Sequence, residues 1–269
     1  MVLENPGRIR VGIGGWTYPP WRKNFYPDGL PHARELEHAS RQLSAIEINA
    51  TYHGTQKPSS FARWRDETPP DFAFSVKASR FATNRKVLGD SRESIERFID
   101  SGISQLGAKL GPVVWQFMPT KRFEPEDFEA FLSALPQQVD GLALRHVLEV
   151  RHESFKTLPY LHLARRYGCA TVLADSDEYP LFCDLTADFV YARLMRSEAQ
   201  LATGYAPSSL DLWAQRAKLW ARGSEPADLP RVQNQTANAA PPRDVFIFFI
   251  SGAKERAPAA AMELLKRLR

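Results

Sequence analysis

The sequence predicts a single (β/α)8 barrel of the TIM type. Short apolar runs alternate with segments of helical periodicity, as in a parallel α/β fold. The runs are rich in Val, Ile and Phe on both faces, as expected for strands that protein covers on either side. The chain has 269 residues, close to the usual length of one such barrel. These observations favour a closed barrel over an open doubly wound sheet.

The expected strands are the apolar runs 9–14, 45–49, 72–77, 112–117, 147–151, 170–175, 188–194 and 245–250. The expected helices are 33–43, 59–65, 91–104, 125–135, 157–167, 208–221 and 257–268. The connection 176–187 is short and interrupted by Pro180, so the helix between the sixth and seventh strands is expected to be reduced or missing. Residues 1–269 are expected to form one domain. Within it, the proline-rich and polar segment 224–244 is expected to form a flexible surface loop.

The composition indicates an ordinary globular protein, with 43% hydrophobic and 25% charged residues. Cys169 and Cys183 form no CxxC pair, which favours a reducing compartment. The sequence contains no apolar stretch of membrane-spanning length, and its first residues do not resemble a signal peptide, so a cytoplasmic protein without a membrane partner is expected. The net charge of +4 permits anionic partners but does not by itself imply nucleic acid. The oligomeric state has no signal in the sequence.

Polar side chains end most of the expected strands. The active site of a TIM barrel forms at the carboxyl ends of its strands, and side chains two residues apart share a face. If Ile46 and Ile48 face the outer helices, Glu47 and Asn49 face the barrel mouth. The same alternation pairs Ser75 with Lys77, Glu149 with Arg151, and Tyr191 with Arg193, while Gln116 and Asp175 end the fourth and sixth strands.

The carboxylates Glu47, Glu149 and Asp175 are therefore expected to converge with the cations Lys77, Arg151 and Arg193. Such a set forms either a structural ion-pair network or a substrate site. A carboxylate beside a desolvated lysine can supply a general base and a general acid, and Lys77 is alternatively a candidate for a Schiff base. A metal is disfavoured because the three cations would occupy the same space, and no cofactor is expected.

Two loops add candidate ligand contacts. Residues 77–86 carry several basic side chains and no acidic one, which suits either a loop that folds over an anionic substrate or a solvated basic loop. The first loop, from Gly14 to Pro27, is rich in aromatic residues and proline. Its aromatic side chains suit a sugar or a base, or they pack against the barrel rim. Its glycines do not form a dinucleotide fingerprint.

An ordered series of motifs runs along most of the chain: Gly14-Gly15-Trp16-Thr-Tyr18, Phe25-Tyr26-Pro27, Glu47-Ile-Asn49, Phe74-Ser-Val-Lys77, Lys109-Leu-Gly-Pro112, Trp115-Gln116-Phe117, Glu149-Val-Arg151-His152, Leu173-Ala-Asp175-Ser176 and Thr186 through Arg193. In this order the motifs resemble the DUF72 (YecE-like) family. The resemblance implies a TIM barrel and, because the family is named for its unknown function, no reaction. It implies a pocket made of Trp16, Glu47, Asn49, Lys77, Gln116, Glu149, Arg151, His152, Asp175 and Arg193.

The sequence departs from the family pattern in two places. After the seventh strand the family usually reads Arg-x-His-Gly, whereas this chain has Arg193-Leu-Met195-Arg196. After the eighth strand the family usually has a pair of asparagines, whereas this chain has Ile250-Ser251-Gly252. The missing imidazole and amides predict altered specificity or weakened chemistry.

The leading hypothesis is an enzyme that acts by acid/base chemistry on a small polar, anionic substrate at the carboxyl rim of the barrel. Its expected catalytic residues are Glu47, Lys77, Glu149 and Asp175. The expected substrate-binding residues are Trp16, Tyr18, Asn49, Tyr52, Gln116, Arg151, His152 and Arg193. One alternative is a protein that binds or processes nucleic acid, suggested by the basic 77–86 loop and the aromatic first loop. The other is a non-catalytic ligand-binding barrel.

Overall fold

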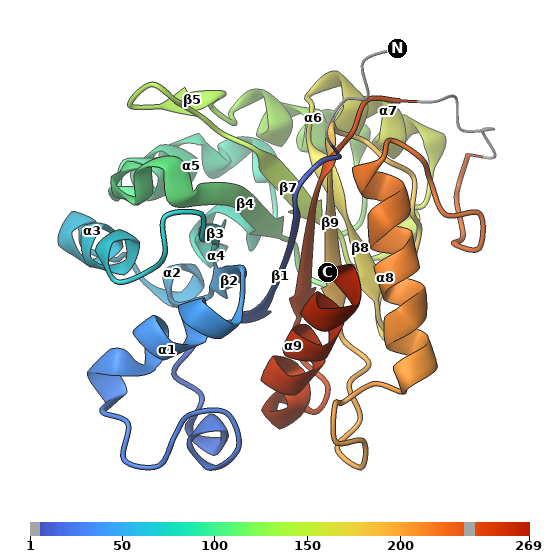
Figure 1. Ribbon diagram of the computed structural model, residues 1–269. Helices are drawn as coiled ribbons and strands as arrows, with labels where there is room; N and C mark the ends of the chain where they lie inside the picture. The colour runs from blue at the N-terminus through green and yellow to red at the C-terminus, as the bar shows by residue number, and fades with distance from the viewer. Residues whose placement is uncertain (1–5, 234–239) are drawn as a thin grey trace.

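A computed structural model describes residues 6–233 and 240–269, and these form a closed parallel barrel with helices around it (Figure 1). The strands are β1 (Ile9–Gly14), β2 (Ala45–Ile48), β3 (Ala73–Lys77), β4 (Leu110–Gln116), β7 (His146–Glu149), β8 (Ala170–Asp175), β9 (Phe189–Leu194) and β10 (Asp244–Phe249). They close in the order β1-β10-β9-β8-β7-β4-β3-β2, and each pairs in parallel with its neighbours. The predicted TIM barrel is confirmed.

The helices of the described residues are α1 (Glu35–Gln42), α2 (Ala50–His53), α3 (Pro58–Asp66), α4 (Arg80–Thr83), α5 (Arg92–Ile99), α6 (Pro125–Ser133), α7 (Leu158–Arg166), α8 (Pro207–Ala221) and α9 (Ala257–Leu268). Short 3-10 turns accompany them: η1 (Pro19–Lys23), η2 (His32–Arg34), η3 (Leu88–Ser91), η4 (Ile103–Lys109), η5 (Glu153–Phe155) and η6 (Lys254–Arg256). Residues 176–188, all of them described, contain no helix, so the prediction of a missing helix between the sixth and seventh strands is confirmed.

The structure adds short elements that periodicity did not predict. A two-stranded hairpin, β5 (Gln138–Val139) and β6 (Leu142–Ala143), precedes β7. The helices α2 and α4 are single turns that follow β2 and β3 directly. A four-residue helix is too short to show a repeating apolar face, so only three-dimensional structure reveals it. Both turns lie at the carboxyl end of the barrel, where they shape its rim.

Alternation along the strands divides the core into two layers. Ile46 and Ile48 are fully buried in the layer between strands and helices, as predicted, whereas Tyr191 and Phe248 belong to the cluster inside the barrel. Gly12 is required beside this inner cluster, because a Cβ atom there would lie 1.9 Å from the carbonyl oxygen of Ala45 and 3.3 Å from the ring of Phe248. The aromatic rings fill the lower barrel and leave the polar residues at its carboxyl end.

The end of the chain closes the barrel beside its beginning. β10 pairs with β1 from Ile9 opposite Val245 to Ile13 opposite Phe249, and α8 lies against α9 on this side (Figure 1). Part of the expected loop 224–244, residues 234–239, lies outside the described residues, so its flexibility stays a prediction. No helix in the described ranges is both long and apolar enough to span a membrane.

Candidate functional site

A buried ion-pair network fills the carboxyl end of the barrel interior. Its centre is Arg193 on β9, whose Nη2 donates to Oε1 of Glu47 on β2 at 2.8 Å. Its Nη1 donates to Oε2 of Glu149 on β7. These three side chains are at most 2% exposed. Burial alone would lower the pKa of Arg193, but the two glutamates raise it, so the guanidinium is held charged.

Tyr191 and Ser75 extend the network downward toward the inner cluster. The Tyr191 hydroxyl donates to Oε2 of Glu47 at 2.7 Å and shares a 2.7 Å hydrogen bond with the Ser75 hydroxyl. The Ser75 hydroxyl oxygen also lies 2.9 Å from the carbonyl oxygen of Pro112, which is a second acceptor for its single proton. Burial, followed by the charge of Glu47, raises the pKa of Tyr191 well above its usual value, so its proton stays on the phenol. Glu47 is thereby held through both of its oxygens.

Arg151 connects the network to the rim. Its Nε and Nη2 donate to Oε1 of Glu149 at 2.9 and 2.6 Å, and Nη2 also donates to Oε1 of Gln116 at 2.8 Å. Its Nη1 lies 3.3 Å from the Tyr179 hydroxyl. Burial would raise the pKa of Glu149, but Arg193, Arg151 and Lys77 outweigh it and lower the pKa to about 2. Glu149 is therefore an anion throughout the neutral range.

Lys77 ends β3 beside this network without joining its hydrogen bonds. Its ammonium lies 4.3 Å from the centre of the Tyr52 ring on α2, and the residue is 9% exposed. Among the described residues it makes no ion pair within 4.0 Å and no side-chain hydrogen bond. Burial and the charge of Arg193 lower the pKa of Lys77 to about 8, against the opposing pull of Glu47 and Glu149. An amine of this kind can exchange a proton near neutral pH.

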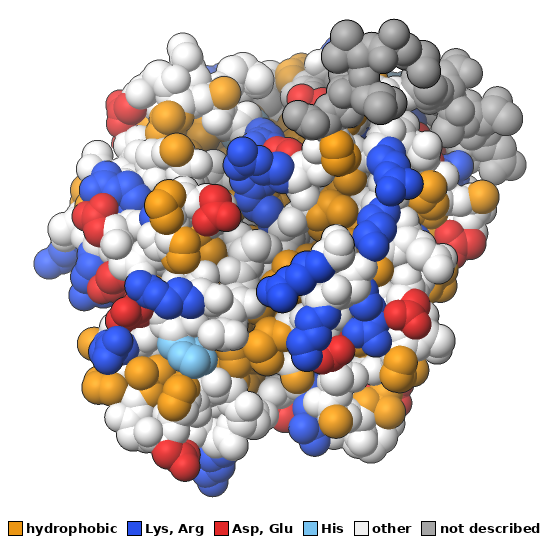
Figure 2. Space-filling view, viewed as in Figure 1, with side chains coloured by type: hydrophobic (Ala, Val, Ile, Leu, Met, Phe, Trp, Pro, Cys, Tyr) orange, Lys and Arg blue, Asp and Glu red, His pale blue; other side chains and the backbone are white. Residues whose placement is uncertain are grey.

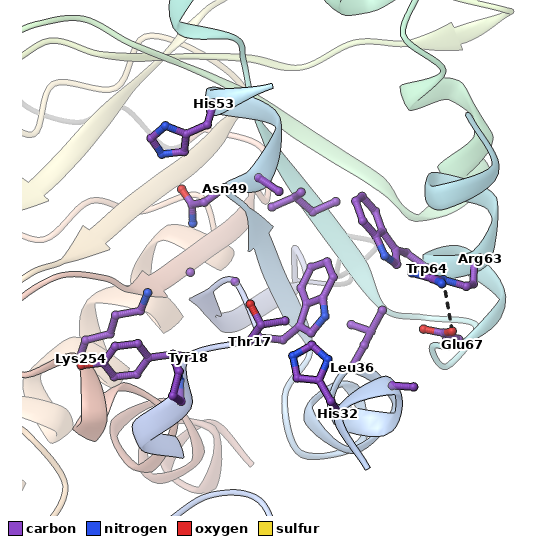
Figure 3. Close-up of a pocket in the computed structure, with 17 residues that line it drawn as sticks. Thr17, Tyr18, His32, Leu36, Asn49, His53, Arg63, Trp64, Glu67 and Lys254 are labelled. Atoms are coloured by element: carbon purple, nitrogen blue, oxygen red, sulfur yellow. Dashed lines mark ion pairs between the residues drawn. The ribbon is translucent and has the colours of Figure 1, made fainter. Parts of the chain in front are cut away.

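A cavity of about 550 Å³ opens beside this mouth, between the loops after β1, β2 and β10 and the helices α1 and α3 (Figure 3). Three of the predicted binding residues line it: Trp16, Tyr18 and Asn49. Trp16 packs edge-to-face on Trp64 of α3, with ring centroids 5.2 Å apart. The ammonium of Lys254 lies 4.7 Å from the centre of the Tyr18 ring. Three expected contacts thus belong to a cavity distinct from the ion-pair network.

Asp175 does not converge with the other carboxylates, so this expectation is wrong. It pairs in register with Leu194 and shares the outward face of β8 with Leu173, whereas Ala174 faces the barrel interior. It lines a separate cavity of about 350 Å³ against α8, where burial raises its pKa. Arg196 Nε lies 3.5 Å from its Oδ1. Neighbouring residues of a strand lie on opposite faces, so the last residue of β8 points outward while the residue before it points inward.

His152 also lies apart from the network. Its Nδ1 accepts a hydrogen bond from the backbone amide of Ser154 at 3.1 Å and lies 2.9 Å from the Ser154 hydroxyl. These contacts cap η5. The structure therefore gives the imidazole a local structural partner, and its expected contact with a substrate stays a prediction.

The two departures from the family pattern contact each other. Gly252, at φ 55°, follows Ser251, at φ 65°, so the loop after β10 turns sharply through left-handed conformations. A side chain at Gly252 would lie 2.7 Å from the Ser197 hydroxyl and 2.8 Å from the carbonyl of Met195. The amide of Ala253 donates to the carbonyl of Ser197 at 2.9 Å. The loops after the seventh and eighth strands thus pack together as one region.

Several residues of the two sites were absent from the predicted set. Tyr191 and Ser75 carry a sequence signal, because each stands two residues before a predicted site residue on the same strand face. Tyr179, Trp64 and Lys254 carry none, because they lie in a loop, a helix and a 3-10 turn that tertiary structure brings to the mouth.

The described residues contain no group of three or more His, Cys, Asp or Glu arranged to hold a metal ion. The carboxylates of Glu47 and Glu149 are already bound by guanidinium and phenol groups. Their donor atoms therefore favour ion pairing over metal coordination.

Comparison with known proteins identifies the family. The family model described as "Protein of unknown function DUF72" matches residues 10–269. The chain belongs to the DUF72 family. The UPF0759 protein YecE of Escherichia coli K12 is 27% identical over 150 residues, a match that covers 55% of this chain and 50% of YecE. The match thus spans about half the length of that relative.

Solved DUF72 structures share the fold. A DUF72 family protein from Thermotoga maritima MSB8 superposes with a TM-score of 0.73 at 20% identity, over 97% of this chain and 99% of that one. A second, from Enterococcus faecalis V583, gives a TM-score of 0.70 at 16% identity, over 97% of this chain and 95% of that one. At these identities the likeness establishes the barrel and not a substrate.

Proposed function

We propose that this DUF72 barrel is an enzyme that acts by acid/base chemistry on a small anionic substrate at its carboxyl rim, with Lys77 as the group that transfers the proton. The observation that carries the proposal is the Lys77 ammonium, which is 9% exposed, lies over Tyr52 and has a pKa lowered to about 8. At pH 7 about a tenth of such a group is the free amine. Both protonation states are therefore available for catalysis.

The two glutamates support Lys77 and do not compete with it. Glu149, with a pKa of about 2 and arginine donors on both oxygens, is a weak base at neutral pH. Glu47 is held by Arg193 and Tyr191. Their fixed negative charges oppose the fall in the pKa of Lys77 and keep it within the neutral range. In this proposal the predicted roles change: the glutamates set the charge around Lys77, and Lys77 transfers the proton.

Arg151 is the cation best placed to hold an anionic substrate group. Its side chain is 15% exposed, whereas that of Arg193 is 2% exposed with both terminal nitrogens bound to carboxylates. The Arg151 guanidinium stacks over Tyr179 at 4.2 Å from the ring centre, which fixes its plane at the rim. A substrate carboxylate or phosphate could then bind Arg151 near the Lys77 amine. Gln116, which accepts from Arg151, would orient the guanidinium.

The test is a turnover screen followed by substitution of the lysine. A mixture of small carboxylates and phosphate esters is incubated with the protein, and consumption is followed by proton NMR. The Lys77→Met variant should lose about a hundredfold or more of any turnover, because positioned acid/base groups contribute that much. The matched control is Lys57→Met, at an exposed position outside both sites. Equal turnover by wild type and Lys77→Met would exclude this role for the lysine.

A second measurement needs no substrate. Trinitrobenzenesulfonate reacts with an amine only in its unprotonated form. The labelling rate of Lys77, followed by peptide mass spectrometry, should therefore rise with pH with a midpoint near pH 8. A midpoint above pH 10 would contradict the proposal. A non-catalytic barrel would instead bind components of the mixture and consume none.

The alternative proposal is that the basic loop 77–86 binds nucleic acid. Arg85 of the basic loop donates to the Ser94 hydroxyl at 2.7 Å and to the carbonyl of Phe81 at 2.9 Å. On the face shown in Figure 2, Lys and Arg side chains are spread out with Asp and Glu side chains between them. A salt-dependent gel shift with short oligonucleotides would support this alternative.

A further inference from the structure

The cavity beside the mouth is built to hold a flat, largely apolar group. Its walls contain the rings of Trp16, Tyr18 and Trp64 and the side chains of Leu36 and Ile48. Its volume of about 550 Å³ lies within the usual range for small-molecule sites. The edge-to-face pair of Trp16 and Trp64 fixes the orientation of both indoles. A planar ring can therefore bury its faces here without rearranging the wall.

One cation faces this apolar space without an acidic partner. Figure 3 shows Lys254 extending from one wall of the cavity toward the side where Asn49 and Thr17 lie. Its ammonium lies 4.7 Å from the centre of the Tyr18 ring, and burial lowers its pKa. In the described ranges it forms no ion pair within 4.0 Å. The one other lysine or arginine of the described lining differs, because Arg63 pairs with Glu67 at 3.6 Å.

The backbone that carries Lys254 is anchored. The indole Nε1 of Trp21, a fully buried residue, donates to the carbonyl of Lys254 at 2.9 Å. The side-chain Nδ2 of Asn24 donates to the carbonyl of Glu255 at 3.0 Å. These bonds hold η6 against the first loop. The ammonium is thus presented from a fixed base and not from a free loop.

The cavity is next to the reactive lysine. His53 lines the cavity, and its ring lies edge-to-face on Tyr52 with centroids 5.1 Å apart. The Lys77 ammonium lies over the same Tyr52 ring, 4.3 Å from its centre. Asn49, at the start of the same short helix, lines the cavity and donates to the carbonyl of Glu47 at 3.3 Å. The single turn of helix α2 therefore lies between this cavity and Lys77.

We propose that this cavity binds a planar ring that bears one anionic group, with the ring against Trp16 and Trp64 and the anion facing Lys254. Asn49 and the Thr17 hydroxyl supply further hydrogen-bond donors at the same end. This cavity is distinct from the substrate site proposed at Lys77 and Arg151, so the proposal does not require its ligand to be the substrate of that function. Binding itself does not depend on that function.

The probe is 2-naphthoate, and its neutral analogue is 2-naphthalenemethanol. Binding is measured by isothermal titration and by saturation-transfer NMR at pH 7. We expect saturable binding of 2-naphthoate and about tenfold weaker binding of the alcohol, because a charge-assisted contact is lost. Lys254→Met should weaken 2-naphthoate binding about tenfold and leave the alcohol unchanged. Lys57→Met, the matched control on an exposed lysine, should bind both as the wild type does.

A blocking variant locates the site. Ala33 lines the cavity and is exposed, so Ala33→Trp should fill the space without burying new polar groups and should abolish binding of both probes. Circular dichroism checks that this variant folds. Absence of saturable 2-naphthoate binding at 5 mM would overturn the proposal. Unchanged 2-naphthoate affinity in Lys254→Met would overturn the assignment of the anion.

The two proposals fail separately. Lys77→Met should retain 2-naphthoate binding, because Lys77 does not line the cavity. Binding without any turnover in the NMR screen would contradict the acid/base enzyme and leave the ring cavity standing. Turnover that depends on Lys77, in a protein that does not bind 2-naphthoate, would overturn the cavity proposal alone.

Discussion

The two sides of the barrel mouth differ in whether their buried charged side chains have partners of opposite charge. On the side of β2, β7 and β9, Arg193 and its two glutamates are almost fully buried and mutually paired. On the side of β1 and β10, Lys254 faces an aromatic cavity with no acidic partner in the described part of the chain. Buried charges are tolerated when they are paired, so a structural role is sufficient to explain the charges on the side of β2, β7 and β9. The second side has a cation whose partner would be a ligand.

Lys77 shares features with both the paired charges and the unpaired Lys254. It is as buried as a network residue, yet its ammonium rests on an aromatic ring as that of Lys254 does. The comparison therefore makes stability a diagnostic quantity. Removing a paired charge should destabilise the fold, whereas removing an unpaired one should not.

The largest effect is expected from Arg193→Met, which leaves Glu47 and Glu149 buried without their shared cation. Breaking a buried pair in this way typically costs about 3 to 5 kcal/mol of unfolding free energy. Urea denaturation followed by tryptophan fluorescence measures the loss. Arg97→Met is the matched control, because Arg97 pairs with Glu93 on the surface at 71% and 79% exposure. Similar losses in both variants would mean that the network is not a structural centre.

Acid should remove the contribution of Glu149. Its pKa falls from 4.5 to about 2 on folding, so the unfolded state binds the proton more tightly. The resulting stability, about 3 kcal/mol, is fully present above about pH 4.5 and is lost as the pH falls toward 2. Glu149→Gln should be less stable than the wild type at pH 7 and approach it at pH 3. Parallel pH profiles of the two proteins would contradict this assignment.

Lys77→Met should raise the unfolding free energy at pH 7, whereas Arg193→Met and Glu149→Gln should lower it. The folded pKa of Lys77, about 8, lies below the ordinary 10.5, so the unfolded chain binds more protons between these values and stability rises with pH across them. Below pH 8 the buried ammonium costs up to about 3 kcal/mol. We expect the variant to be about 1 to 3 kcal/mol more stable at pH 7, with the gain vanishing near pH 10.5. A destabilised variant at pH 7 would place Lys77 among the structural charges.

The smallest effect is expected at the outer edge of the cavity. Arg63 and Glu67 form an i,i+4 pair at 3.6 Å, with Arg63 67% exposed. Arg63→Met should change the unfolding free energy by no more than about 0.5 kcal/mol. The same urea titration measures it. A loss above 1 kcal/mol would show that the cavity wall, and not only the ion-pair network, supports the barrel.

The sequence predicted the barrel and most of its network because both follow from alternation along strands. Glu47, Lys77, Glu149 and Arg193 stand on the inward face of strands whose other face is largely apolar, and that alternation is visible in the sequence. Asp175 shows the limit of this reasoning. Its strand is apolar on both faces, so the sequence does not reveal which face the last residue takes.

The cavity escaped prediction for a different reason. Trp64 reads as an ordinary buried position of an amphipathic helix, and Lys254 follows the last strand in a 3-10 turn. Trp64 reaches Trp16 from α3, and Lys254 reaches the same cavity because β10 pairs with β1 and brings the first and last loops together. No spacing within the chain encodes a contact across more than two hundred residues, such as the one between Trp21 and Lys254.

That hydrogen bond also bears on folding. Trp21 and Lys254 are separated by 233 positions, and contacts of such long range can form only after much of the chain has been ordered. The cavity should therefore be completed in the same step that adds β10 to β1. Ligand binding would then report barrel closure: in a refolding experiment the 2-naphthoate signal should appear after the helical circular dichroism signal, with the slowest phase of the reaction.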